Sequence, residues 1–191
     1  MYKFFAYLDR MKYIKRWALM RSTREENIME HSLSVAFIAH SLALIKNKIY
    51  KGNVDVDKTV MMAIYHEVSE VITGDMPTPI KYFNPEIKTA YKDLEQVACD
   101  KILSYLPEEL YEDYKIYVEP DTSSYEYKLV KMADRIGAYV KCLEELKVGN
   151  NEFKKAKKQI EKDINACTLQ EVQYFMKNIA PSFSLTLDEL D

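Results

Sequence analysis

Two histidines and two acidic residues lie where the sequence otherwise predicts apolar helix faces. His31 precedes an apolar helical stripe, His66 is followed directly by Glu67, and Asp134 lies in the mainly apolar stretch 129–138. A buried carboxylate without a partner is unfavourable by several kcal/mol, and a divalent cation can satisfy several such groups at once. Imidazole and carboxylate donors suit Zn, Mn, Fe or Co. The pattern therefore predicts one metal site in a helical bundle.

Spacing alone leaves ordinary structural roles open for these residues. A single histidine on a helix is more often a core or surface residue than a metal ligand. Asp134 could simply pair with Lys131 or Arg135, which flank it. His40 lies among apolar residues of the same segment as His31 and is expected to be structural only.

The elements that must position these side chains are predicted to be helices. The chain has only four glycines and six prolines, and between them apolar residues recur at helical spacing. Asn27 followed by Glu30 resembles a capping box and predicts a helix start. Two prolines within 74–79 interrupt the helical pattern, and no alternating strand pattern is present. We expect helices at about 27–51, 57–72, 85–106, 107–117, 124–147 and 151–179.

Composition narrows the class of protein. A chain of 191 residues, 48% of them hydrophobic, fits a single compact all-α domain that covers residues 1–191. A net charge of −3 does not suggest a surface for polymeric nucleic acid. The N-terminus lacks a signal-peptide pattern, and no uninterrupted apolar run approaches ~18 residues, so no membrane span is expected. Three separated cysteines without a CxxC pair favour a reduced cytoplasm.

The ligand pattern His31, His66-Glu67 and Asp134 resembles the H…HD…D set of the HD-domain phosphohydrolase superfamily. The surrounding sequence is similar, in order and over nearly the whole chain, to the bacterial 5′-deoxynucleotidases. The stretch GDMPTPIKYF at 74–83 is far more specific than the bare ligand pattern. The other similar stretches are Arg16-Trp17, Met20-Arg21, Glu30–Ser32, Tyr65–Glu70, Leu129–Asp134, Lys141–Leu146, Gly149–Phe153, Pro181–Phe183 and Leu187–Glu189.

The resemblance implies a fold, an activity and a cofactor. The fold would be an HD-domain helical bundle, and the reaction would be hydrolysis of deoxyribonucleoside 5′-monophosphates to deoxyribonucleoside and phosphate. One divalent metal ion per chain (Co, Mn, Zn, Fe or Cu) would activate water and offset charge on the phosphoryl group. The resemblance also points to a homodimer, for which the apolar surface of the last predicted helix offers an interface.

The resemblance also implies roles for single residues around the metal. His31, His66, Glu67 and Asp134 would be the metal ligands. Glu70, one helical turn beyond His66, would be the catalytic residue that orients the attacking water or assists proton transfer. A solvated acid on a helix face is the ordinary alternative for Glu70.

A second group of residues would bind the substrate. Arg16 would grip the phosphate with its planar fork of donors. Trp17 would line the sugar pocket and leave no room for a ribose 2′-hydroxyl, although by itself it could be a core aromatic residue. Asp75 would accept a hydrogen bond from the 3′-hydroxyl, or be only a turn residue. Thr78 and Lys81 would border the pocket.

One departure from the family pattern is the doublet itself, which is His66-Glu67 rather than His-Asp. Glutamate carries the same donor group on one more methylene, but a shift of ~1 Å in a preorganised site can reduce the rate about 100-fold. The substitution leaves three interpretations: a retained site with altered metal preference, which we favour, a weakened enzyme, or a protein that binds nucleotide without turnover. An HD hydrolase for another nucleotide is a further alternative.

Overall fold

The computed structural model describes residues 1–81 and 83–191, so Tyr82 of the GDMPTPIKYF stretch lies outside the described residues. The only pairing of extended backbone within these ranges is an isolated antiparallel bridge between Lys15 and Asn27. The predicted all-α fold is thereby confirmed. The helices are α1 (Phe4–Asp9), α2 (Ile28–Lys48), α3 (Val56–Tyr65), α4 (Glu70–Thr73), α5 (Thr78–Lys81), α6 (Pro85–Leu103), α7 (Tyr111–Val118), α8 (Tyr125–Lys147), α9 (Lys154–Asn165) and α10 (Gln170–Asn178).

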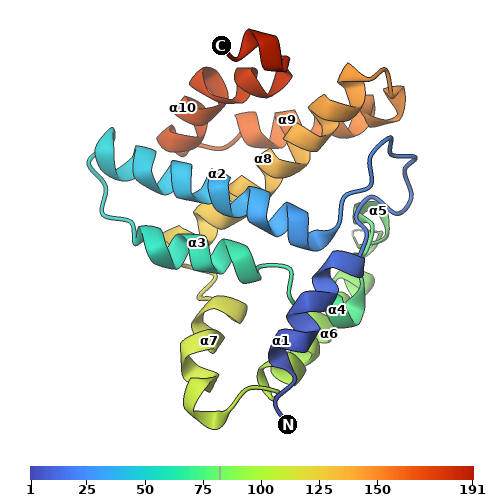
Figure 1. Ribbon diagram of the computed structural model, residues 1–191, viewed down its shortest axis with the longest axis vertical. Helices are drawn as coiled ribbons and strands as arrows, with labels where there is room; N and C mark the ends of the chain where they lie inside the picture. Colours follow the sequence, from blue (N-terminus) through green and yellow to red (C-terminus); the bar gives the residue numbers. More distant parts are fainter. Residues whose placement is uncertain (82) are drawn as a thin grey trace.

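Helix α2 forms the centre of the molecule and packs against α3, α8 and α10 (Figure 1). It begins where the sequence predicts, because the side chain of Asn27 accepts hydrogen bonds from the backbone N–H groups of Met29 and Glu30. Its length and apolarity would suffice to cross a membrane, but 56% of the relevant window is buried inside the fold. The apolar composition of α2 is thus accounted for by its place in the core.

Two adjacent hydrophobic clusters form the core of the molecule. The larger joins α2, α3, α8, α9 and α10, and the smaller joins α1, α6 and α7 around the end of α3. Figure 1 shows α9 and α10 at the top and α1, α6 and α7 at the bottom. Ile64 and Tyr117 pack against both clusters. The C-terminal end of α3 therefore lies where the two clusters meet.

The helix predicted over 57–72 is not continuous, because it is interrupted at residues 66–69. Helix α3 ends at Tyr65, residues 66–69 form tight turns, and α4 begins at Glu70. In these turns the N–H of Val68 donates to the carbonyl of Tyr65, and that of Glu70 to Glu67, three residues back instead of four. His66 consequently caps α3 rather than lying in mid-helix, and the turn points Glu67 back toward α2.

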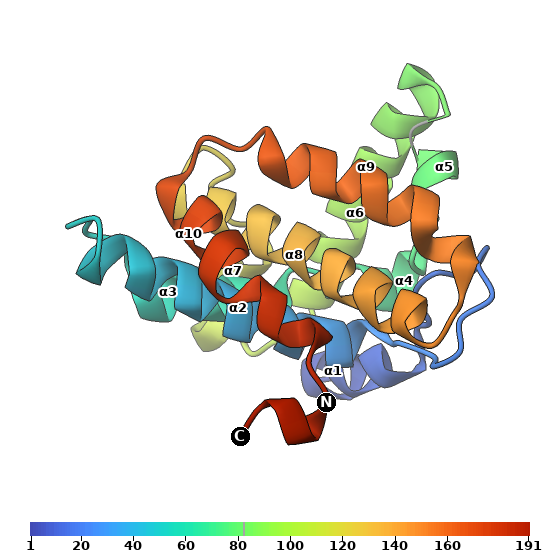
Figure 2. The same cartoon turned by 90° about the horizontal axis from the view of Figure 1, so that it is seen from above.

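The single last helix predicted over 151–179 is also wrong, since the chain divides it into α9 and α10. The break allows α10 to fold back so that Val172 and Phe175 are buried in the main core (Figure 2). Phe153 and Ile164 are buried as well. The apolar residues predicted to form a dimer interface therefore serve largely to pack this chain's own core. The short helix α1 at the N-terminus was not predicted.

Candidate metal centre and substrate pocket

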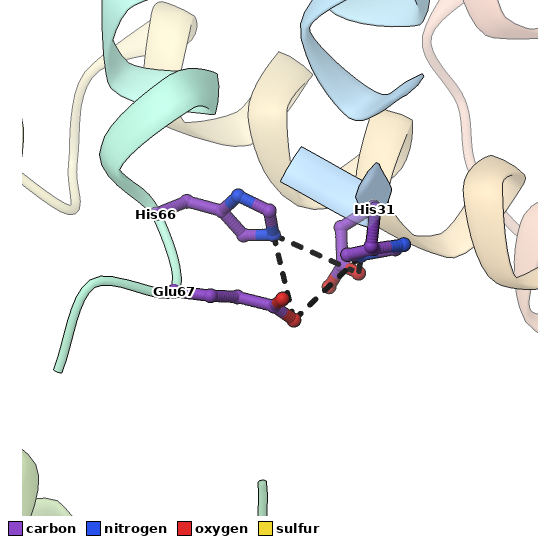
Figure 3. Close-up of side chains that lie close together, drawn as sticks. His31, His66 and Glu67 are labelled. Carbon is purple, nitrogen blue, oxygen red and sulfur yellow. Dashed lines mark hydrogen bonds and ion pairs between the residues drawn. The ribbon is translucent and has the colours of Figure 1, made fainter. Parts of the chain in front are cut away.

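Four side chains from three different elements meet at the junction of the two clusters. His31 comes from the first turns of α2, His66 and Glu67 from the turn after α3, and Asp134 from α8. One donor atom from each lies within 4.8 Å of all the others. Figure 3 shows the side chains of His66 and Glu67 directed toward His31. The residues predicted as metal ligands from their types and spacing are thus brought together.

Four separations between the donor atoms can be compared with the size of a single-cation site. Nε2 of His31 lies 2.9 Å from Asp134 Oδ1 and 3.6 Å from Glu67 Oε1. Nε2 of His66 lies 3.7 Å from Glu67 Oε1 and 4.0 Å from Asp134 Oδ1. Ligands held ~2.1 Å from one ion are at most about 4.2 Å apart. These contacts fall within that limit.

The hydrogen bonds of His66 leave its inward nitrogen free to bind a cation. Its Nδ1 donates to the backbone carbonyl of Ala63 at 2.7 Å, because a carbonyl oxygen can only accept. In the neutral ring, Nε2 then carries the lone pair. Within the described residues, this buried Nε2 and the buried Oε2 of Glu67 have no hydrogen-bond partner. Buried polar atoms without a hydrogen-bond partner are rare in protein interiors. Each of these two atoms carries a lone pair that a metal ion could bind.

Burial and neighbouring charges set the ionisation of these groups. Burial lowers the pKa of His66, and this effect exceeds that of the Glu67 carboxylate, which raises it. Burial would also lower the pKa of His31, but Glu67 and the hydrogen bond to Asp134 raise it to about 9. For Asp134, the cost of burial is outweighed by the hydrogen bond with His31 and by Lys131, so its pKa lies well below the usual range. Asp134 is therefore ionised.

Gly137 permits the close approach of α8 to α2 beside His31. A Cβ atom at this position would lie 3.3 Å from both His31 Cε1 and Val35 Cγ2. These contacts are tighter than ordinary van der Waals contacts, so the His31 and Val35 side chains would have to shift by a few tenths of an ångström to admit a Cβ atom. The glycine within the stretch LVKMADRIGA thus serves the geometry of the cluster.

Arg16 reaches the cluster from the irregular segment 14–27. Its Nη1 forms an ion pair with Glu67 Oε1, and its Nε donates to Glu26 Oε2 at 3.2 Å. Burial would lower the pKa of Arg16, but Glu67, Asp134 and Glu26 raise it above its ordinary value. A permanently charged guanidinium therefore lies next to the candidate ligands.

Trp17 is held in a defined orientation beside Arg16. Its backbone has a φ of 62°, a left-handed conformation that is unusual for a large side chain. The indole Nε1 donates to Glu26 Oε2 at 2.9 Å, and the ring lies 5.2 Å from that of Phe153. The side chain is thus held by a hydrogen bond at its edge and by contact with the tilted Phe153 ring.

Glu70 and Asp75 lie near the same group of charges. Burial, together with Glu67 and Asp75, raises the pKa of Glu70 to about 9, and its Oε2 is buried without a partner within the described ranges. Burial also raises the pKa of Asp75. The charge of Arg16 and a hydrogen bond from the backbone N–H of Trp17 lower this pKa, but burial has the larger effect. Glu70 is therefore a buried acid and not the solvated helix-face residue of the alternative interpretation, and Asp75 contacts the Trp17 segment.

The remaining predicted substrate residues lie at the periphery. Lys81 pairs with Glu95 at 2.8 Å and lies over the ring of Tyr91, and Thr78 is exposed at the start of α5. On α8, Arg135 pairs with Asp163 and not with Asp134. His40 is exposed on α2, away from the cluster-facing side of that helix.

Three residues around the site were not predicted. Glu26 contacts both Arg16 and Trp17, Phe153 packs on Trp17, and Lys131 Nζ lies 3.6 Å from Asp134 Oδ2. Lys131 was considered only as an ion-pair partner that would give Asp134 a structural role in place of metal binding. Phe153 belonged to a stretch similar to the family, but it was assigned to the apolar surface of the last predicted helix and not to the site. Glu26 directly precedes the helix cap Asn27, and no sequence signal distinguishes it from the neighbouring Glu25.

Comparison with known proteins identifies the family. A family model described as 5′-deoxynucleotidase YfbR-like matches residues 3–183. A 5′-deoxynucleotidase of Vibrio vulnificus is 53% identical over 188 residues, which cover 98% of this chain and 97% of that protein. A 5′-deoxynucleotidase of Pectobacterium atrosepticum is 51% identical over 188 residues, 98% of this chain and 94% of that protein.

Solved structures share the fold at lower identity. An HD-domain phosphohydrolase from Listeria innocua superposes with a TM-score of 0.84 at 24% identity, covering 95% of this chain and 88% of that one. An HD phosphohydrolase of cyanophage S-2L, solved with dA and one catalytic Zn²⁺ ion, gives a TM-score of 0.66 at 19% identity, over 93% and 96% of the two chains. The matches support the main functional interpretation and not its alternatives. The chain belongs to the 5′-deoxynucleotidase YfbR-like family and is a phosphoric monoester hydrolase with the HD-domain fold.

Proposed function

We propose that this 5′-deoxynucleotidase hydrolyses deoxyribonucleoside 5′-monophosphates at a divalent metal ion held by His31, His66, Glu67 and Asp134. The main support for this proposal is that two buried atoms, His66 Nε2 and Glu67 Oε2, have no hydrogen-bond partner in the described part of the chain. Both residues lie close to His31 and Asp134. A bound cation would supply Lewis-acid stabilisation of the phosphoryl group and would favour ionisation of water. The whole chain, 1–191, is assigned to this one phosphohydrolase domain.

Glu70 is the residue proposed to act on the attacking water. In the reaction, a water oxygen forms a bond to phosphorus while the bond from phosphorus to the 5′-oxygen breaks. One proton leaves the water and one proton reaches the 5′-oxygen of the released deoxyribonucleoside. Glu70 is buried, and one of its oxygens has no protein partner in the described part of the chain. That oxygen is available to orient the water or to assist proton transfer.

Arg16, Trp17 and Asp75 are proposed to recognise the substrate. The guanidinium of Arg16 lies beside Glu67 and presents a planar set of donors suited to a phosphate. The rigid indole of Trp17 would exclude a ribose 2′-hydroxyl, and Asp75 would accept a hydrogen bond from the 3′-hydroxyl. Thr78 and Lys81 would border the pocket from α5. None of these contacts reads the base, so several deoxynucleotides should be substrates.

The identity of the metal belongs to the proposal. Imidazole and carboxylate donors accommodate Co, Mn, Zn, Fe or Cu, and the cyanophage phosphohydrolase was solved with one catalytic Zn²⁺ ion. We favour a site that retains one divalent ion per chain, with a preference altered by the longer Glu67 side chain.

The assembly and location are proposed on other grounds. We infer a homodimer that uses the exposed side of α2, where Leu33 and Phe37 are 54% and 67% exposed one helical turn apart. Phe37→Glu should reduce the particle mass measured by light scattering if this surface joins two copies.

The three free cysteines suit a reduced cytoplasm.

Metal removal combined with a substrate panel tests the proposal. The purified protein would be dialysed against a chelator and then assayed with dAMP, AMP and dATP after addition of Co²⁺, Mn²⁺ or Zn²⁺. We expect phosphate release from dAMP, little from AMP or dATP, and none before metal is restored. Full activity of the chelated protein would contradict the metal site, and equal use of dAMP and AMP would contradict the proposed selectivity.

A further inference from the structure

Glu26 connects three side chains to which the proposed function gives separate tasks. We propose that Glu26 is a positioning residue, whose single carboxylate fixes Arg16 and Trp17 relative to His31. The inference rests on the proposed function, because Arg16 and Trp17 are taken as the phosphate and sugar contacts. It goes beyond that function by naming the group that sets their geometry.

The contacts divide between the two oxygens of the carboxylate. Oε2 accepts from Trp17 Nε1 at 2.9 Å and from Arg16 Nε at 3.2 Å. Oε1 faces His31 Nδ1 at 3.8 Å, on the side of the imidazole opposite the nitrogen that contacts Asp134. The Glu26 side chain is 17% exposed, so these contacts are partly shielded from water. One side chain therefore touches the guanidinium, the indole and a candidate ligand.

Arg16 and Trp17 need such a support because they lie outside any helix. The segment 14–27 is irregular, and its Trp17 residue has positive φ. The indole N–H is the only polar group on the Trp17 side chain, so its hydrogen bond determines how the ring is rotated. Phe153 supports the ring but supplies no directional contact. The Arg16 guanidinium is held on two sides, by Glu26 and by Glu67.

The backbone closes the segment independently of the Glu26 side chain. The N–H of Arg16 donates to the carbonyl of Glu26 at 2.9 Å, and that of Ile28 donates to the carbonyl of Ile14 at 3.0 Å. Both bonds use backbone groups, which substitutions with Gln or Ala at position 26 leave in place. An effect on substrate selection can therefore be separated from an effect on folding.

Glu26→Gln is the direct test, with Glu25→Gln as its matched control. Glu25 precedes Glu26 in the chain but is exposed and pairs only with Lys15 in the described structure. We expect Glu26→Gln to raise KM for dAMP and to lower the dAMP-to-AMP ratio of kcat/KM roughly tenfold, with a smaller change in kcat. Glu25→Gln should leave these values at the wild-type level.

Trp17 is the only tryptophan, so its fluorescence reports on Glu26 without substrate or metal. Glu26→Ala, which removes the acceptor of the indole N–H, should shift the emission and increase quenching by acrylamide, whereas Glu25→Ala should not. Wild-type emission and quenching in a folded Glu26→Ala protein would overturn the proposal. If the wild-type enzyme itself does not prefer dAMP over AMP, the proposed selectivity fails, and the fluorescence result still decides whether Glu26 holds the indole.

Trp17→Phe gives a second route that leaves Glu26 intact, because it removes the N–H while keeping an aromatic ring. It should lower the dAMP-to-AMP ratio, and adding Glu26→Gln to it should lower that ratio little further. Fully additive effects of the two substitutions on the ratio would overturn the proposal. If Glu26→Gln does not fold, an unchanged ratio in Trp17→Phe alone would overturn it.

Discussion

The guanidinium of Arg16 and the carboxylate of Glu67 form an ion pair between the irregular N-terminal segment and the turn after α3. Glu67 is the residue at which this chain departs from the His-Asp doublet. Its Oε1 pairs with Arg16 and also lies within 3.7 Å of the Nε2 atoms of His31 and His66. A candidate ligand and the proposed phosphate contact are therefore electrostatically linked.

Glu67→Asp should preserve or raise kcat with dAMP. Aspartate offers the same donor to a metal ion, and its shorter side chain would weaken the pair with Arg16 and leave the guanidinium free for phosphate. Steady-state kinetics with metal-loaded protein would measure this, using exposed Glu25→Asp as the control. A loss of about 100-fold would instead indicate a site built around the longer side chain.

His66→Ala should abolish both metal retention and phosphatase activity. Its Nε2 is buried beside Glu67 and Asp134, so the substitution removes one of the four donors. We expect the metal content to fall well below one ion per chain and kcat/KM to fall by at least ~100-fold. Elemental analysis and dAMP hydrolysis would be compared in wild-type, His66→Ala and His40→Ala proteins.

His40→Ala is the matched control, because His40 is exposed on α2 and distant from the cluster-facing side. Both variants should retain the helical circular dichroism spectrum. Undiminished activity in His66→Ala after chelation would be incompatible with the metal mechanism.

The sequence predicted those features that depend on local chemistry. Asn27 caps α2 because its side chain bonds to the next N–H groups in the chain, and this requires no tertiary contact. His31, His66, Glu67 and Asp134 could be selected because polar groups on apolar faces need partners. Even so, spacing alone left their structural roles open until the family resemblance supplied the order of the motif.

The features that were missed depend on contacts between distant segments. Nothing in His66-Glu67-Val68-Ser69 resembles a helix-stop signal, since no glycine or proline is present and Val68 continues the apolar period. The interruption accompanies the ion pair of Glu67 with Arg16, which lies in the irregular N-terminal segment. The break between α9 and α10 likewise depends on tertiary packing, because it accompanies the burial of Val172 and Phe175 in the main core.

Trp17→Ala should admit AMP alongside dAMP. Removing the indole would open the space in which a ribose 2′-hydroxyl is proposed to be excluded, and would leave Phe153 without its aromatic neighbour. We expect kcat/KM for AMP to rise by roughly tenfold or more relative to that for dAMP, the range that a pocket contact of this size supplies. Unchanged discrimination would remove Trp17 from the selectivity mechanism.

Glu145 should make folding stability depend on pH under acidic conditions. This side chain on α8 is 1% exposed and accepts hydrogen bonds from Lys141, Asn150, and both the backbone and hydroxyl of Thr23. Burial alone would raise its pKa, but these donors lower it from the ordinary 4.5 to about 2. The network ties α8 to the segment that follows Trp17.

Because the folded-state pKa is depressed, the contribution of Glu145 is complete above about pH 4.5 and is lost as the pH falls toward about 2. Glu145→Gln should lower the free energy of unfolding at pH 7 by about 2–4 kcal/mol and flatten its decline below pH 4.5. Urea unfolding at pH 7, 4 and 3 would measure both effects. Glu109→Gln, at an exposed glutamate outside this network, is the control. If both variants show the wild-type decline, Glu145 does not carry this pH dependence, and the Thr23 segment must be held mainly by other contacts.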